Sequence, residues 1–123
     1  MKKILVVEDV LGTQKFVFSE LEQSGYSVLA ASDLVEALEM ISMQNFDLFI
    51  LDDMMPRVSG YEGIRAIQSR ERIQKVPIVM MSRGLDLDEV TRVRTLGVNI
   101  LNKPLKQNEL REAVSYLTKE VGH

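Results

Sequence analysis

The chain has 123 residues, of which 46% are hydrophobic, and its formal net charge at pH 7 is −3. This length fits one domain with a single core and is too short for two domains of ordinary size. The acidic balance argues against direct binding of nucleic acid or of an anionic membrane, because both attract clusters of lysine and arginine. The chain has no cysteine, which excludes disulfides and thiolate metal sites.

The sequence also lacks the pattern of a targeting or membrane segment. Its N-terminal apolar run is short and is interrupted by Glu8 and Asp9, unlike a signal peptide, and no other run is long enough to cross a bilayer. We therefore expect a cytoplasmic protein with no membrane partner. We expect a single domain over residues 1–121, because Gly122 and His123 resemble the remnant of an affinity tag.

Short apolar runs alternate with helical patterns in the first half of the chain. The run over 48–51 is apolar without a break and is followed by Asp52 and Asp53, which is typical of a strand buried inside a parallel sheet. Asp33, with Glu36 three residues later, resembles a capping box at the start of a helix. The predicted elements of this half are a strand over 4–7, a helix over 11–24, a strand over 26–31, a helix from Asp33 and a strand over 46–51.

The second half of the chain continues this alternation. Pro77 lies near the start of a predicted strand, where a missing N–H is tolerated, and Gly97 ends a predicted helix. Asn102, Lys103 and Pro104 end the last predicted strand. The predicted elements of this half are a helix over 59–72, a strand over 76–81, a helix over 86–96, a strand over 98–101 and a helix over 107–119.

Strand and helix therefore alternate five times along the chain. This pattern predicts a parallel five-stranded sheet with right-handed crossovers and helices on both faces. At this length the expected architecture is the α/β flavodoxin-like fold, a doubly wound (βα)5 sandwich with strand order 2-1-3-4-5. Its ligands are expected where the strand order reverses, between the first and third strands.

Polar side chains follow four of the five predicted strands. These are Glu8 and Asp9 after the first strand, Asp52 and Asp53 after the third, Ser82 after the fourth and Lys103 after the fifth. Because the carboxyl ends of parallel strands share one edge, the carboxylates should crowd into one crevice, where a divalent cation relieves their repulsion. Oxygen ligands without histidine or cysteine suit Mg²⁺. An acid, a metal, a hydroxyl and an ammonium group at one point suit phosphoryl transfer.

Each of these residues has an ordinary structural explanation when it is considered alone. Glu8 and Asp9 fit a solvated loop, Ser82 fits a helix cap, and Lys103 fits a surface charge beside a turn proline. Asp52 alone fits a turn residue. A suitable group after four of the five strands is much less expected by accident than any one such residue. The set as a whole therefore favours a functional site at the sheet edge.

The same residues carry a family resemblance. The matching segments are Ile4-Leu5-Val6-Val7-Glu8-Asp9, Gly25-Tyr26, Glu36-Ala37-Leu38, Asp47-Leu48 through Asp52-x-x-Met55-Pro56 with Gly60, Pro77-Ile78 through Ser82, and Gly97 through Lys103-Pro104. Over almost its whole length, the chain resembles the receiver domain of two-component response regulators, and in particular the chemotaxis-regulator type.

The resemblance implies a role for each residue of the set. Asp52 would be the phosphoacceptor, Asp9 a direct Mg²⁺ ligand, Glu8 a ligand through water, the Met54 backbone carbonyl a further ligand, and Ser82 and Lys103 the partners of the phosphoryl oxygens. The Lys103–Pro104 peptide bond would be cis, which would aim the lysine into the site.

Three residues depart from the pattern of receivers. Arg83 replaces the usual small residue after Ser82, and either gates the phosphoryl donor or pairs with Asp53. Asp53 occupies a position that is usually apolar. Ile100 replaces the aromatic switch residue, in a segment that is one residue short, so the usual output switch is not expected.

By this resemblance the chain is a phosphoacceptor and not an enzyme in the ordinary sense, although it would catalyse its own phosphorylation and dephosphorylation. Its partners would be a histidine kinase or histidine phosphotransfer domain, and a downstream effector or fused output domain. One alternative is a receiver-like interaction module that works without phosphate. An aspartyl-nucleophile phosphatase is disfavoured because Met54 stands where such enzymes place a second acid, and an FMN protein is disfavoured because no Ser/Thr/Gly-rich loop follows the first strand.

Overall fold

The computed structural model describes residues 1–70, 73 and 75–119. The main sheet contains β1 (Lys3–Val7), β2 (Ser27–Ala31), β3 (Leu48–Asp52), β6 (Ile78–Ser82) and β7 (Asn99–Asn102). The helices are α1 (Leu11–Gln23), α2 (Leu34–Met43), α3 (Gly60–Gln68), α4 (Leu87–Thr95) and α5 (Gln107–Leu117). The suggested tag remnant at 122–123 lies outside the described residues, as does the end of the predicted domain at 120–121.

The five strands of the main sheet are all parallel and lie in the order β2-β1-β3-β6-β7. Because β6 and β7 are the fourth and fifth strands of this sheet along the chain, the order is the predicted 2-1-3-4-5. Between β3 and α3 the chain also forms a small antiparallel hairpin of β4 (Met54–Met55) and β5 (Val58–Ser59). Pro56 and Gly60 are typical of a turn or loop, and the short strands on either side of Pro56 are found only in the structure.

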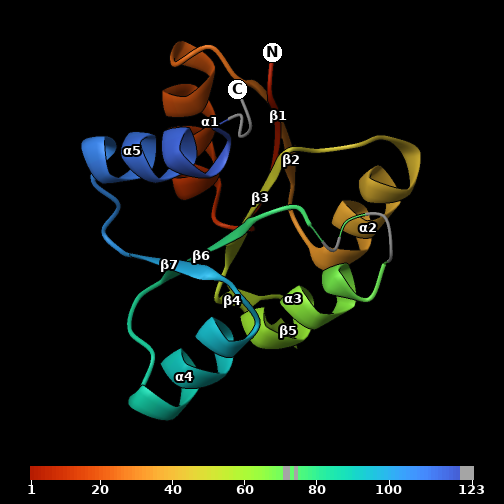
Figure 1. Cartoon of the computed structure of the whole chain (residues 1–123), viewed down its shortest axis with the longest axis vertical. Helices are drawn as coiled ribbons and strands as arrows, with labels where there is room; N and C mark the ends of the chain where they lie inside the picture. Colours follow the sequence, from red (N-terminus) through yellow and green to blue (C-terminus); the bar gives the residue numbers. More distant parts are fainter. Residues whose placement is uncertain (71–72, 74, 120–123) are drawn as a thin grey trace.

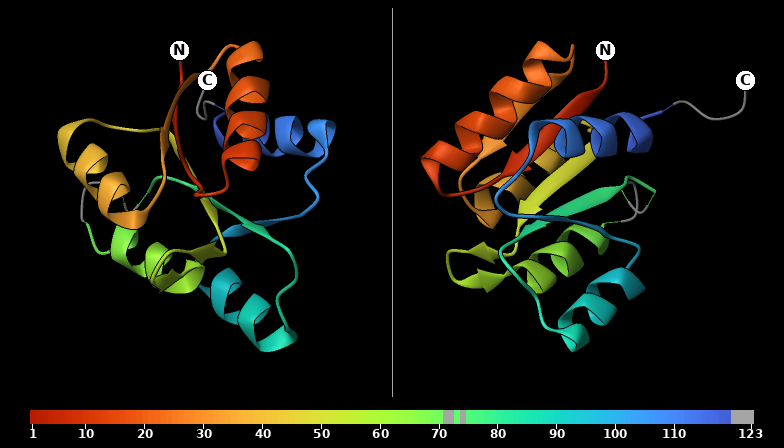
Figure 2. Two further views of the ribbon diagram at one scale, coloured as in Figure 1. Left: turned by 180° about the vertical axis from the view of Figure 1, so that it is seen from behind. Right: turned by 90° about the vertical axis from the view of Figure 1, so that its left-hand side faces the viewer.

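Helices cover both faces of the sheet (Figures 1 and 2). Helices α1 and α5 pack together on one face, and α2, α3 and α4 lie on the other. Alternate residues of β1 point to opposite faces, so Leu5 and Val7 enter one core while Ile4 and Val6 enter the other. All five residues of β3 and of β6 are buried, as expected for central strands of a parallel sheet.

The predicted helix ends agree with the structure except in α3. Gly25 and Gly97, which follow α1 and α4, have positive φ angles of 96° and 78° that glycine adopts without strain. The third helix was predicted to reach Arg72, but α3 ends at Gln68. Ser69 follows the helix as its C-cap: its N–H donates to the Arg65 carbonyl and its hydroxyl to the Ala66 carbonyl at 2.7 Å. Residue 72 itself lies outside the described part of the chain.

The N-termini of three helices are capped by side chains. Asp33 accepts from the Glu36 backbone N–H at 2.8 Å, but Glu36 reaches back to the Ser32 N–H, so the predicted capping box forms only in part. Asp86 and Glu89 make the complete reciprocal box at the start of α4. None of the helices within the described residues is long and apolar enough to span a bilayer.

Candidate functional site

The predicted site residues do meet at the carboxyl edge of the sheet. Asp52 is the last residue of β3 and Ser82 the last residue of β6, so the ends of two paired strands present them side by side. Glu8 follows β1, which pairs with β3, and Lys103 follows β7, which pairs with β6. Residues from four separate parts of the sequence therefore share one edge because the sheet is parallel.

Glu8, Asp9 and Asp52 form an acidic cluster. One carboxylate oxygen from each lies within 4.8 Å of the others. Glu8 is 0% exposed, and neither of its carboxylate oxygens accepts a hydrogen bond of ordinary geometry from any residue that the structure describes. Buried oxygens without donors are costly unless something else satisfies them. The cluster therefore fits a hard divalent cation such as Mg²⁺, as its oxygen-only donor set predicts.

The Lys103 ammonium group lies against the same carboxylates. Its Nζ donates a hydrogen bond to Asp52 Oδ1 at 2.8 Å and lies 3.6 Å from Glu8 Oε1. The Lys103–Pro104 peptide bond is cis, as predicted. The Lys103 backbone N–H donates to the Ser82 carbonyl at 2.7 Å, which ties the loop after β7 to the loop after β6.

The electrostatics of the cluster are clearest at Glu8. Burial and the neighbouring Asp52 carboxylate raise the pKa of Glu8 from its ordinary value to about 7, and the Lys103 charge only partly offsets them. The protein therefore holds a carboxyl group that loses its proton near neutral pH. A cation among these carboxylates would favour the charged form.

One positioning residue was missed by the sequence analysis. Gln14, in α1, donates from its side-chain Nε2 to the Glu8 carbonyl at 2.7 Å, and the Glu8 N–H donates to the Ala31 carbonyl at 3.0 Å. These bonds fix the backbone of the acidic loop between β1 and α1. In the sequence, the feature that could have indicated this role is a glutamine in the first turns of the helix that follows Glu8 and Asp9.

Ser82 and Asp53 make an unexpected contact. The Ser82 hydroxyl donates to Asp53 Oδ2 at 3.0 Å, and the hydroxyl oxygen accepts from the Gly84 N–H at 3.1 Å. The possible Asp53–Arg83 pair does not form, because Arg83 makes no ion pair with residues 1–70, 73 or 75–119. Arg83 is exposed and lines the acidic crevice together with Asp9, Asp52 and Met54. The role predicted for the Met54 carbonyl remains a prediction.

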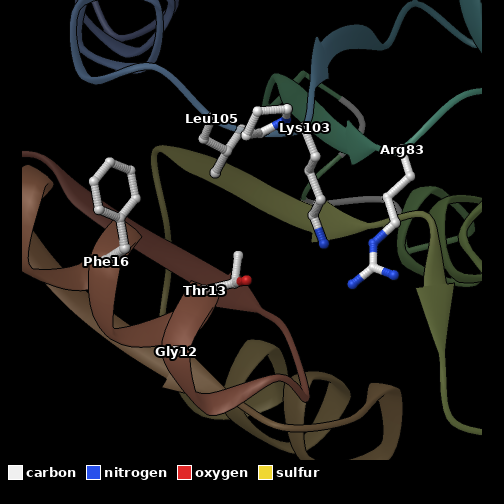
Figure 3. Close-up of a pocket in the computed structure, with 7 residues that line it drawn as sticks. Gly12, Thr13, Phe16, Arg83, Lys103 and Leu105 are labelled. Atoms are coloured by element: carbon white, nitrogen blue, oxygen red, sulfur yellow. The ribbon is translucent and has the colours of Figure 1, made fainter.

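A groove of about 550 Å³ lies beside the crevice (Figure 3). The nitrogen ends of Lys103 and Arg83 point into the same space, Thr13 lies across from them on α1, and Phe16 lies farther along α1 on the side of Leu105. Leu105 adds an apolar wall beyond Lys103. The groove therefore combines apolar walls with two cationic groups next to the Asp52 carboxylate.

The sequence pattern of the response regulator receiver domain family matches residues 4–115, which is most of the chain. The chain belongs to this family. As a receiver, it is the phosphoacceptor partner in two-component signalling, and its acidic pocket is the place where receivers generally bind Mg²⁺. Its fold agrees: the chemotaxis response regulator CheY4 of Vibrio cholerae superposes with a TM-score of 0.88 at 27% identity, over 95% of this receiver and 98% of that chain.

Relatives of this receiver differ in length. The chemotaxis protein CheY of Pseudomonas aeruginosa is 29% identical, over 98% of both proteins. The probable transcriptional regulator ycf29 of Pyropia yezoensis is 30% identical, but the receiver spans 52% of its length. The CAI-1 autoinducer sensor kinase/phosphatase CqsS of Vibrio cholerae is 34% identical, and the receiver spans 17% of it. This sequence therefore matches both a protein of its own length and parts of larger ones.

Ile100, the third departure from the usual receiver pattern, lies in β7. It is half-buried and packs against the core formed with α2, α3 and α4. An aliphatic side chain here fills space in the core without the hydroxyl or ring of an aromatic residue. Its effect on the output switch stays a prediction.

Proposed function

We propose that this receiver takes a phosphoryl group onto Asp52 from the phosphohistidine of a histidine kinase or histidine phosphotransfer domain. The observation that carries the proposal is the contact between Asp52 and Lys103 at the mouth of the acidic cluster. Asp52 is 4% exposed, so it is nearly buried at the end of a rigid central strand. A reacting carboxylate held in this way loses little freedom when the donor arrives.

The proposed reaction divides the two oxygens of the Asp52 carboxylate. Lys103 holds Oδ1 at 2.8 Å and leaves Oδ2 free of the ammonium group. One carboxylate oxygen bonds to phosphorus while the N–P bond of the phosphohistidine breaks, and its electron pair stays on the imidazole nitrogen. The Lys103 ammonium is close enough to neutralise charge on the transferred oxygens.

Glu8, Asp9 and Asp52 would hold Mg²⁺, with the Met54 backbone carbonyl as a further ligand. The ion would neutralise charge between the acceptor and the anionic donor. Gln14 keeps the loop that carries Glu8 in place, and Lys103 balances part of the remaining negative charge. The ligand roles of these residues and the autocatalysis that the site would support are both part of the proposal.

The groove of Figure 3 is the proposed approach for the donor. Phe16, Pro104 and Leu105 offer apolar contact to a partner helix, while Arg83 and Lys103 attract the phosphoryl group. After transfer, the Ser82 hydroxyl would bond a phosphoryl oxygen, and the loops after β6 and β7 would shift together because Lys103 and Ser82 share a backbone hydrogen bond. A downstream effector or a fused output domain would bind the shifted loops.

The alternative is a receiver-like interaction module that works without phosphate. Arg83 at the crevice and Ile100 in β7 motivate it. The intact arrangement of Asp52, Lys103 and the acidic cluster favours phosphorylation, because an interaction module has no need of a buried acid cluster next to a lysine.

Intact-mass measurement after treatment with acetyl phosphate, with and without Mg²⁺, tests the proposal. We expect a Mg²⁺-dependent gain of one phosphoryl group that Asp52→Asn eliminates. Asp53→Asn is the matched control, because it removes a neighbouring carboxylate and should retain the gain. A gain that persists in Asp52→Asn, or that peptide mapping assigns to Asp53, would contradict the assignment. No gain in the wild-type protein would favour the phosphate-independent module.

A further inference from the structure

We propose that Asp53 is a positioning residue that holds the Ser82 hydroxyl away from the phosphoryl site, so that phosphorylation of Asp52 breaks the Ser82–Asp53 hydrogen bond. The inference rests on the proposed function and adds a competing partner for Ser82. It concerns a residue that has no part in the reaction itself.

The Ser82 hydroxyl group is engaged both as a hydrogen-bond donor and as an acceptor. Its hydrogen is donated to Asp53 Oδ2 at 3.0 Å, and its oxygen accepts from the Gly84 N–H at 3.1 Å. Ser82 is 0% exposed, so water does not reach it to replace either partner. The hydroxyl is therefore fixed on the Asp53 side of the crevice.

Asp53 is a rigid anchor for this bond. Its backbone N–H donates to the Met81 carbonyl at 2.9 Å, and its own carbonyl accepts from the Gly60 N–H at 2.8 Å. Both bonds attach it to buried structure, on β6 and at the start of α3. The carboxylate consequently stays in place when the loop after β6 moves.

A serine hydroxyl has one hydrogen to donate. Ser82 therefore cannot donate fully to Asp53 and to a phosphoryl oxygen on Asp52 at once. Both acceptors are anionic, so the exchange replaces one charge-assisted bond by another of similar strength. An apolar residue at position 53 leaves the hydroxyl without this competitor, and the phosphorylated state then forms more readily.

Asp53 can give up the hydroxyl without being left buried and unpaired. It is half-buried and lines cavities on several sides, one of which it shares with Arg92 of α4. Water or a cationic side chain can therefore reach the released carboxylate. The part of the opposition that comes from the Ser82–Asp53 bond is then that of one hydrogen bond to a charged group, which corresponds to about tenfold in an equilibrium constant.

The negative charge of Asp53 opposes phosphorylation by a second route, because it repels an anionic donor whether or not Ser82 is bound to it. Asp53→Asn separates the two effects, since its side-chain oxygen still accepts from Ser82 while the charge is gone. Asp53→Leu removes both the charge and the acceptor. Asp53→Ala removes them without adding bulk.

The test measures the affinity of beryllium trifluoride, a tetrahedral analogue of the phosphoryl group, in the presence of Mg²⁺. We expect Asp53→Leu and Asp53→Ala to bind it at least about tenfold more tightly than the wild-type protein, and Asp53→Asn to stay closer to wild type. In a Ser82→Ala background, the increase in beryllium trifluoride affinity caused by Asp53→Leu should be about tenfold smaller, because only the charge effect remains. Thermal melting of each variant verifies that it is folded.

An equal gain in both backgrounds would show that Asp53 acts by charge alone and would overturn the inference. So would unchanged affinity in Asp53→Leu and Asp53→Ala while the wild-type protein still binds the analogue, an outcome that leaves the proposed function standing. If the wild-type protein neither binds the analogue nor gains a phosphoryl group, the proposed function fails and the inference fails with it.

Discussion

The Glu8 carboxyl group is buried beside Asp52 and has a pKa of about 7, so its ionisation links folding to pH. Its ordinary value is 4.5, so the folded protein holds the proton more tightly than the unfolded chain does. The corresponding stabilisation is fully present below pH 4.5 and is lost as the pH rises to about 7. The size of the change is roughly 1 to 3 kcal/mol.

We therefore expect the metal-free protein to lose stability between pH 4.5 and 7 through Glu8. Urea unfolding in EDTA at several pH values measures this, with Glu8→Gln as the control that removes the titrating group. The wild-type curve should fall relative to the control curve over this range, and Mg²⁺ should reverse the fall by favouring the charged form. Parallel curves for the two proteins would show that Glu8 titrates normally.

Arg83 lines both the acidic crevice and the groove beside it, and it is exposed. Its guanidinium charge attracts an anionic donor, yet its bulk stands where receivers usually carry a small residue. An exposed ion pair between Arg83 and the donor would contribute at most about 1 kcal/mol to donor binding. One misplaced ångström near reacting atoms can slow a reaction by on the order of 10²-fold. Obstruction should therefore outweigh attraction.

We expect Arg83→Ala to speed both phosphorylation by acetyl phosphate and loss of the phosphoryl group, as followed by intact mass over time. Arg94→Ala, which removes an exposed arginine in the last turn of α4, is the charge-matched control and should change neither rate. Slower phosphorylation in Arg83→Ala would instead assign donor binding to this residue.

At the scale of elements, the start of α3 is packed directly against the end of β3. A Cβ atom at Gly60 would lie 2.8 Å from Asp53 Cα, 3.1 Å from the Asp52 carbonyl oxygen and 2.7 Å from the end of the Met80 side chain. The Met80 side chain can move aside, but the backbone of residues 52–53 carries Asp52, the proposed acceptor. Only glycine lets the helix begin this close to the site.

We expect Gly60→Ala to destabilise the protein by about 1 to 3 kcal/mol, the usual range for overpacking, and to slow phosphorylation. Gly12→Ala is the control: it lies in α1, and a Cβ there meets nothing within 4 Å, so stability should be unchanged or slightly higher. Urea unfolding and the mass assay give the two readouts. Equal stability of the two variants would show that the backbone around Asp52 and Asp53 moves aside for a Cβ at position 60 at little cost.

At the scale of the whole molecule, the sheet is stable at its centre and weaker at one edge. Strands β1, β3 and β6 lie between other strands and are almost entirely buried, whereas β7 has a partner only on the β6 side and none of its residues is fully buried. The residues that respond to phosphate in the proposed function follow β6 and β7. The scaffold below Asp52 is thus rigid, and the responsive side is the weaker one.

We expect backbone amides of β1 and β3 to exchange with deuterium at least about tenfold more slowly than those of β7. Hydrogen exchange with mass spectrometry of peptides from each strand measures the difference. Addition of Mg²⁺ and beryllium trifluoride should protect the loops after β6 and β7 and leave the β2 peptides unchanged. Uniform protection of all five strands would argue against a separate responsive edge.

The sequence determined the order of the elements and the edge at which the site lies. Apolar runs and helical spacing are local patterns, and five alternations of them leave one simple parallel arrangement. Asp52 and Lys103 could be assigned to one edge before any coordinates, because every strand of such a sheet points the same way. Even the boundaries agreed to within a few residues, except at α3, which ends at Gln68.

The tertiary structure alone decided which groups touch. Ser82 binds Asp53 across 29 positions of sequence, and Lys103 binds Asp52 across 51. Such contacts depend on the packing of strands and loops to within fractions of an ångström, which no spacing along the chain encodes. For the same reason, the burial of Glu8, the support from Gln14 and the groove between α1 and the loops after β6 and β7 became visible only in the folded chain.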